Sequence, residues 1–141
     1  MTDHTKRAEA LSLKAGSLSS GVDPITFSVL LHAIGQASLE MTTVLQHGAR
    51  STIISIARDH SASIYTATAQ MLYQNDALPI HSVGGALNIE AIIEEFGGDI
   101  HEGDVFMIND PFMGTTHNSD LTVIMPVFHN GRHIFWTAVR A

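Results

Sequence analysis

The 141-residue chain contains no cysteine, which excludes disulfides, thiolate metal sites and cysteine nucleophiles. Charged residues are also scarce, at 15% of the chain, against roughly 25% in typical soluble domains. This deficit predicts that part of the surface is covered, either by a partner subunit or by further polypeptide. A sparsely charged monomer is the alternative.

Basic residues are few. Seven lysines and arginines face fourteen acidic residues, for a net charge of −7 with neutral histidines, and without a basic stripe a nucleic-acid partner is not expected. The chain has no signal-peptide-like apolar segment and no run of about 18 apolar residues, which favours a cytoplasmic protein without a membrane span. It contains neither GxxxxGK[ST] nor GxGxxG, so ATP binding by this chain alone is not expected.

The chain divides into a polar arm at 1–22 and one domain at 23–141. Asp23 and Pro24 are typical of a helix start, because aspartate caps the first turn and proline is tolerated within it. Apolar residues then recur at three- and four-residue spacing up to Gly48. This pattern predicts one long amphipathic helix whose apolar stripe lies in the core or at a subunit interface.

The remainder favours β-structure around one shorter helix. Residues 51–72 are rich in β-branched side chains and predict one or two strands, with a turn around 58–61. A helix is expected after Gly84-Gly85, ending at Gly97-Gly98, then a strand within 101–110. The fold class is therefore α+β: a long N-terminal helix plus a mixed, largely antiparallel sheet.

The C-terminal part predicts a hairpin. Asn130-Gly131 lies between two β-rich runs and is a favoured two-residue turn. The second run continues to Ala141 in what looks like a central strand. From this we expect the neighbouring strand to be supplied by further polypeptide or by another chain.

Polar chemistry is concentrated in the segment 109–123, which reads NDPFMGTTHNSDLTV. His117 and Asp120 are three residues apart, so an imidazole nitrogen and a carboxylate oxygen can converge on one divalent ion. Nitrogen and oxygen donors without sulfur suit Zn, Mn or Fe. Asp110 could add an oxygen or orient the imidazole. The alternative is a loop histidine hydrogen-bonded to a nearby aspartate.

Two further positions carry ionisable groups in apolar surroundings. His81 lies in a glycine-rich connection and could be a third ligand brought in from a distance; a core or surface histidine is the alternative. The triplet Arg58-Asp59-His60 places charge in an otherwise apolar run. An ion pair at a strand end and a substrate contact both explain it.

The chain resembles the N-terminal part of the hydantoinase B/oxoprolinase family in three segments that follow one another in the same order: ARDHSASIY, LPIHSVGGAL and GDVFMINDPFMGTTHNSDLTVIMPVF. The last of them is similar to that family's signature, G-D-V-x-x-x-N-D-P-x-x-G-x-T-H-x-x-D. The resemblance runs from about Asp23 to the end of the chain and covers roughly the first quarter of a usual member. Members continue after this point with a glycine-rich segment containing histidine and aspartate, so a further ligand or base is expected outside these residues.

The resemblance implies a role for five residues. His117 and Asp120 match T-H-x-x-D, and with His81 they are the expected metal ligands. Asp59 and Asp110 match acidic positions of the family and are the expected catalytic carboxylates, able to move a proton.

The resemblance also implies an activity. The expected protein is a metal-bearing B-type subunit, or a fragment of one, in an ATP-dependent cyclic amide hydrolase. It would act on a small molecule activated by a hydantoinase A-type subunit, which uses the ATP, in a hetero-oligomer. Two alternatives stay open: a subunit of an acetone/acetophenone-type ketone carboxylase, and a non-catalytic module that docks on such a complex.

Overall fold

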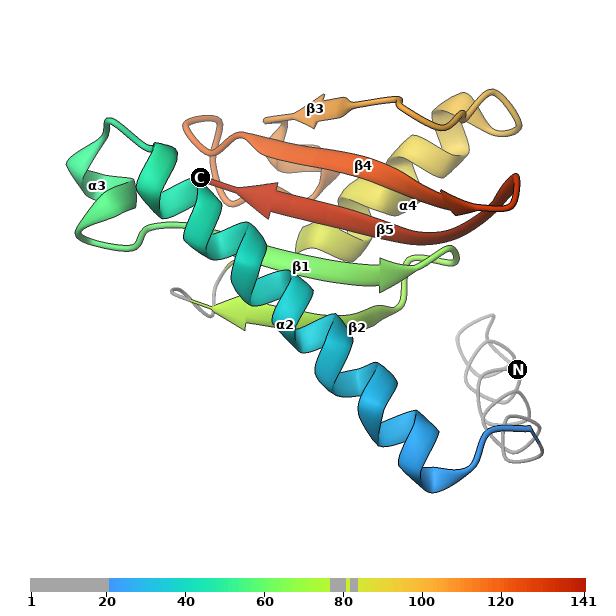
Figure 1. Cartoon of the computed structure of the whole chain (residues 1–141). Helices are drawn as coiled ribbons and strands as arrows, with labels where there is room; N and C mark the ends of the chain where they lie inside the picture. The colour runs from blue at the N-terminus through green and yellow to red at the C-terminus, as the bar shows by residue number, and fades with distance from the viewer. Residues whose placement is uncertain (1–20, 77–80, 82–83) are drawn as a thin grey trace, which may run out of the picture. The chain divides into compact units, whose positions relative to one another are not determined.

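The computed structural model describes residues 21–76, 81 and 84–141, so the arm expected at 1–22 lies almost entirely outside it. The elements, in chain order, are α2 (Pro24–Gly48), α3 (Thr52–Ser55), β1 (Ser61–Thr66), β2 (Met71–Asp76), α4 (Gly84–Phe96), β3 (Phe106–Ile108), the 3-10 turn η3 (Pro111–Met113), β4 (Thr122–His129) and β5 (Arg132–Arg140) (Figure 1). None of the helices in these ranges is both long and apolar enough to span a bilayer.

The chain forms two compact units, one up to His32 and one from Ala33 onward. The first contains the start of α2, where the Asp23 carboxylate accepts hydrogen bonds from the backbone N–H groups of Ile25 and Thr26, both at 3.0 Å. This side chain caps the helix as the sequence predicts. The second unit contains the rest of α2 and all of the sheet.

Five strands form one sheet in the order β2-β1-β5-β4-β3, and every pairing between them is antiparallel. β5 is central, as expected, but it pairs with β1 on one side and β4 on the other. The expectation that its neighbouring strand must come from elsewhere is therefore wrong. The C-terminal part of the chain supplies one neighbour through the Asn130-Gly131 turn, and β1 supplies the other from a distance of about 75 residues.

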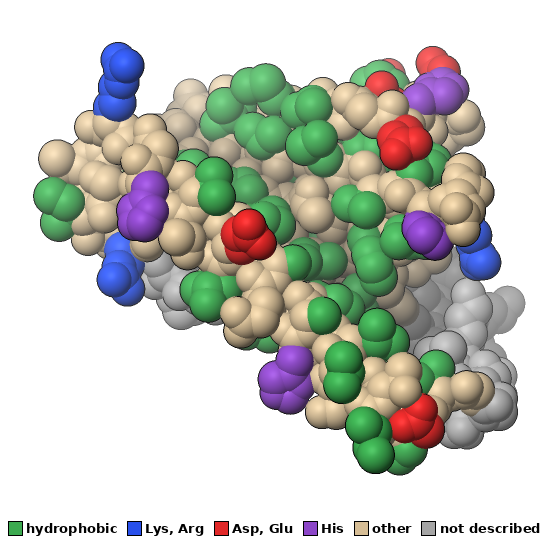
Figure 2. All heavy atoms as spheres, in the orientation of Figure 1, with side chains coloured by type: hydrophobic (Ala, Val, Ile, Leu, Met, Phe, Trp, Pro, Cys, Tyr) green, Lys and Arg blue, Asp and Glu red, His purple; other side chains and the backbone are tan. Residues whose placement is uncertain are grey.

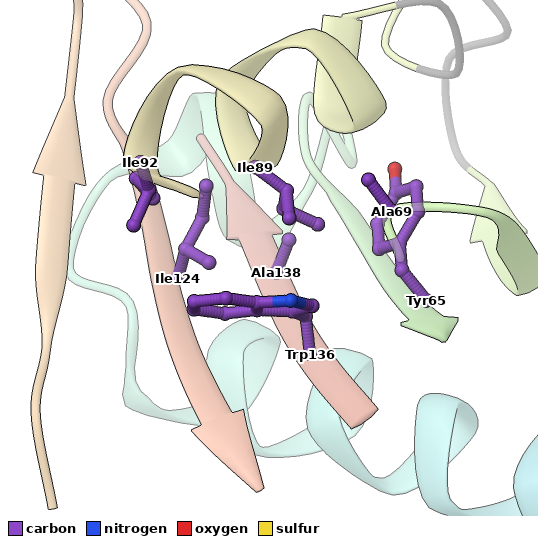
Figure 3. Close-up of a cluster of buried hydrophobic side chains, with 7 residues drawn as sticks. All are labelled: Tyr65, Ala69, Ile89, Ile92, Ile124, Trp136 and Ala138. Atoms are coloured by element: carbon purple, nitrogen blue, oxygen red, sulfur yellow. The ribbon is translucent and has the colours of Figure 1, made fainter. Parts of the chain in front are cut away.

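Helix α4 covers one face of the sheet and forms the main core with it (Figure 3). Trp136 of β5 is fully buried, and Ile89 and Ile92 of α4 lie against the same layer as Ile124 of β4. The helix ends at Phe96, and Gly97 adopts the left-handed conformation with φ +53°. The predicted glycine stop of this helix is confirmed.

The opposite face of the sheet carries the part of α2 that follows Ala33. The Ser38 hydroxyl donates to the Ala62 carbonyl of β1 at 3.0 Å, and Gly35 lets the helix approach the Tyr73 ring. Beside the helix lies an apolar groove of about 590 Å³, lined in part by Met41, Ile64 and Val139. Figure 2 shows hydrophobic side chains gathered across this face.

The prediction for residues 51–72 is wrong in part. Residues 52–55 form a single helical turn, α3, and the first hairpin turn lies at 66–70 rather than around 58–61. The Thr66 hydroxyl holds that turn by accepting from the backbone N–H groups of Thr68 and Gln70, and Ala69 adopts φ +62°. The turn contains no glycine, proline or asparagine, so the usual sequence signals of a turn are absent.

Candidate functional site

The loop between β3 and β4 carries the candidate ligands, and its own side chains shape it. The Asp110 carboxylate accepts a hydrogen bond from the Phe112 N–H at 2.9 Å and so caps η3. Gly114 ends this turn with φ +104°, which favours glycine. The chain then reverses so that the residues from Thr115 to Asp120 return toward the start of β4.

His117 and Asp120 lie together in this loop. His117 Nδ1 is 3.3 Å from Asp120 Oδ1, and the Thr116 hydroxyl donates to Asp120 Oδ2. The Asp120 side chain is 11% exposed, whereas that of His117 is 60% exposed. The Asp120 carboxylate is therefore held within the protein, and the His117 imidazole lies at the surface beside it.

His81 approaches the same carboxylate from another part of the chain. Its Nε2 lies 3.9 Å from Asp120 Oδ2 and 3.8 Å from Asp59 Oδ1. The His81 ring is buried, and Asp59 is about half exposed. Segments around residues 59, 81 and 117–120, distant in sequence, thus bring four of the five expected site residues together.

Burial decides the charge state of His81. Burial is the largest effect, and it lowers the pKa of the His81 imidazole below its usual value of about 6.5. The carboxylates of Asp120 and Asp59 raise this pKa, whereas Arg140 lowers it further. The ring is therefore neutral at pH 7, the form in which histidine binds metals. Its Nδ1 is buried and has no hydrogen-bond partner among the residues that the structure describes.

Asp110 does not join this group. Within the described residues it makes no ion pair with His81 or His117, and one of its oxygens is occupied in capping η3. It is also exposed, so its place is that of a loop-shaping residue. Over the same ranges of the chain, no set of three or more histidine, aspartate or glutamate side chains is arranged to hold a metal ion.

Sequence reasoning missed Arg140, which is 3% exposed on the α4 face of the sheet. Its Nε donates to the Thr122 hydroxyl at 2.8 Å, and its Nη2 donates to Asn88 Oδ1 at 2.8 Å and to the Gly114 carbonyl at 3.2 Å. Burial lowers the pKa of Arg140, and the nearby Asp120 raises it. No motif marks this arginine, because strand register alone brings it to the loop.

His60 is a second residue whose position the sequence did not indicate. It directly precedes β1 and is fully buried, and neither ring nitrogen has a hydrogen-bond partner within the described ranges. Burial lowers the pKa of His60, and so does Arg58, whereas Asp59 raises it. The triplet of residues 58–60 is thus split: Arg58 is exposed at φ +57°, Asp59 faces His81, and His60 is buried.

Residues 23–141 match the sequence model of the family described as hydantoinase B/oxoprolinase. The chain belongs to that family. The chain is similar to three curated relatives. Caprolactamase subunit beta of Pseudomonas jessenii is 34% identical over 119 residues, which are 84% of this chain and 20% of the relative. The 5-oxoprolinase of Dictyostelium discoideum is 31% identical over 90% of this chain and 10% of its own length. Acetophenone carboxylase delta subunit of Aromatoleum aromaticum is 30% identical over 86% of this chain and 18% of the relative.

A solved structure confirms the fold of this hydantoinase B family chain. The crystal structure of the ATP-dependent caprolactamase from Pseudomonas jessenii superposes with a TM-score of 0.79 at 34% identity, over 86% of this chain and 21% of the caprolactamase chain. The α+β prediction and the family resemblance are both confirmed. The chain spans about one fifth of the caprolactamase subunit and about one tenth of the 5-oxoprolinase.

Proposed function

We propose that this chain is a metal-bearing B-type subunit, or a fragment of one, in an ATP-dependent cyclic amide hydrolase. The observation that supports this proposal is that His81 and His117 both lie beside the Asp120 carboxylate. The chain is also 34% identical to a caprolactamase subunit. A hydantoinase A-type partner would use ATP to activate the ring carbonyl. The substrate class is then a lactam, hydantoin or 5-oxoproline.

The nitrogen and oxygen donors of His81, His117 and Asp120 are of the types that bind a divalent cation, and the His117–Asp120 pair lies near the spacing of two ligands on one ion. Two ligands at about 2.1 Å from an ion in tetrahedral geometry are themselves about 3.4 Å apart. His117 and Asp120 place their donors 3.3 Å apart, and His81 and Asp120 place theirs 3.9 Å apart. Asp120 takes part in both pairs through a different oxygen each time, so the pairs share one carboxylate. Nitrogen and oxygen donors favour Zn, Mn or Fe in the two-plus state.

A bound divalent ion would supply two effects, a water with pKa near 7 and polarisation of the substrate oxygen. The chain's own residues perform the remaining tasks. Asp59 lies beside His81 and is half exposed. In this proposal its carboxylate takes a proton from the attacking water and returns it to the ring nitrogen of the substrate. Thr116 holds Asp120 oriented through its hydroxyl.

Metal content and ring opening test this proposal separately. His117→Ala and Asp120→Asn should each lower the bound metal, measured by mass spectrometry after gel filtration of the full chain with its partner. Asp59→Asn should keep the metal and reduce ATP-dependent lactam hydrolysis by about 10²- to 10⁴-fold. His129→Ala is the matched control, because His129 is exposed on the β4–β5 hairpin.

An ion bound equally well by wild type and by both ligand variants would contradict the assignment of His117 and Asp120. No ion in the chain alone or with its partner would instead favour a module that docks on the complex without chemistry. A loss of metal in Asp59→Asn would show that Asp59 is a metal ligand and not the group that transfers the proton.

A ketone carboxylase subunit is the second candidate. It is favoured by the 30% identity to the acetophenone carboxylase delta subunit over 86% of this chain. Only a carboxylase incorporates carbon from bicarbonate, so products formed with ¹³C-labelled bicarbonate distinguish the two candidates. Label in a carboxylic acid product would overturn the hydrolase.

A further inference from the structure

Resting on the proposed function, we propose that Arg140 is a positioning residue for the metal site. Its buried guanidinium fastens the loop that carries His117 and Asp120 to β4 and to α4, and so holds these ligands in place. Arg140 itself touches neither substrate nor metal. It acts through the three groups to which it donates hydrogen bonds.

The guanidinium connects three elements. Nε binds the Thr122 hydroxyl, two residues after Asp120 at the start of β4. Nη2 binds the carbonyl of Gly114 in the loop and the side-chain oxygen of Asn88 in α4. The loop residues from 115 to 120 are therefore held at both of their ends by one side chain. Hydrogen bonds from a charged donor are about twice as strong as neutral ones.

Asn88 extends the same connection. It is fully buried, accepts from Arg140 through Oδ1 and donates through Nδ2 to the Met113 carbonyl. Two successive loop carbonyls, those of Met113 and Gly114, are thus bound by side chains from α4 and β5. An amide oriented in this way satisfies donor and acceptor together, which fixes its rotamer.

The glycines show how closely the loop is pressed against the helix. A Cβ added to Gly84 would lie 1.6 Å from the Gly114 carbonyl oxygen and 2.8 Å from Arg140 Nη2. No other residue type fits there without moving the loop. The loop is therefore positioned by two interactions at Gly114: close packing against Gly84 and the hydrogen bond from Arg140.

Lysine is a poor replacement for this arginine. The guanidinium presents donors in a planar fork, whereas an ammonium group is a single point donor on a flexible stem. Thr122 and Asn88 accept from different nitrogens of the fork. A lysine keeps the charge near Asp120 but cannot bind both acceptors in the same geometry.

The test measures Mn²⁺ affinity and backbone hydrogen exchange in the full chain with its partner. Arg140→Met should weaken Mn²⁺ binding at least tenfold, the lower range for loss of groups that orient ligands. Amide exchange across residues 112–121 should rise by a similar factor. Arg132→Met is the matched control, an exposed arginine at the other end of β5, and should change both readouts less than twofold.

Two further variants decide the mechanism. Asn88→Ala removes only the α4 side of the connection and should reproduce both effects; it also replaces Arg140→Met if that variant does not fold. Arg140→Lys should restore neither readout. Full rescue by lysine would overturn the proposal, because charge alone would then suffice.

The two proposals can fail separately. Wild-type protein that binds none of Zn²⁺, Mn²⁺ and Fe²⁺ overturns the metal-bearing function, and exchange across 112–121 then decides the loop-positioning role alone. Variants that lower the melting temperature yet leave both Mn²⁺ affinity and loop exchange unchanged show that Arg140 is merely structural and overturn the inference.

Discussion

Replacing Gly84 with alanine puts a methyl group where there is no room for one. The added Cβ would lie 1.6 Å from the Gly114 carbonyl oxygen, a backbone atom, so either α4 or the loop must shift by more than an ångström. The same movement lengthens the 3.2 Å hydrogen bond from Arg140 Nη2 to that carbonyl. The substitution therefore strains the packing and weakens a charged hydrogen bond at once.

Both effects have known magnitudes. Overpacking a well-filled site costs about 1–3 kcal/mol, and a hydrogen bond to a charged group contributes about 1.5–3 kcal/mol. The better helix propensity of alanine returns at most about 1 kcal/mol. We expect Gly84→Ala to lower the free energy of unfolding by about 2–5 kcal/mol, a large part of the stability of a small domain.

Urea unfolding followed by tryptophan fluorescence measures this loss directly, because Trp136 is the single tryptophan and is fully buried in the core. Gly98→Ala is the matched control: nothing lies within 4 Å of its added Cβ, and its unfolding free energy should stay within about 0.5 kcal/mol of wild type. Equal stability of the two variants would refute the close contact between α4 and the loop.

Three further outcomes are expected. Burial lowers the pKa of His60, so the unfolded chain binds the proton more tightly; metal-free protein should lose stability as the pH falls below about 6.5, by at most about 1.4 kcal/mol per pH unit for this residue. His60→Phe should reduce that slope in urea titrations, and an unchanged slope would exclude His60 as its source. Trp136→Ala should cost about 3–5 kcal/mol by circular dichroism, because the ring is fully buried, and Trp136→Phe should cost less. Asn130→Val should lower the thermal midpoint, because a β-branched residue at φ +50° costs about 1–2 kcal/mol, whereas Asn130→Gly should not; equal midpoints would argue against the turn.

Local patterns predicted the elements that local chemistry determines. The β4–β5 hairpin follows from Asn130-Gly131, whose positive φ angles of 50° and 73° suit these two residue types. The start of α2 follows from Asp23, which caps it. Three of the four residues at 52–55 are β-branched, yet the segment is helical, because no strand of the described sheet pairs with it and Ile53 stays 59% exposed. Strand propensity has no effect where there is no sheet to join.

In the candidate site, too, some residues were predictable from local sequence and others depend on the assembled sheet. His117 and Asp120 are close in sequence, so their proximity was predictable. His81 and Asp59 were candidates from their local surroundings, and the family resemblance added the roles expected of them. Arg140 was not predictable, since nothing in a strand sequence tells which loop its side chain will reach. Its position depends on the register that pairs it with Thr122, and that register is a property of the assembled sheet.

The alternation along β5 ties the folding of the core to the assembly of the candidate site. Trp136 and Arg140 project from the same side of one strand, four residues apart, toward the core cluster and toward the ligand-bearing loop respectively. A slip of one residue against β4 would turn both away to the groove side simultaneously. A misaligned chain therefore cannot keep its hydrophobic core packed while only the candidate site is distorted, and the two are gained or lost in a single step.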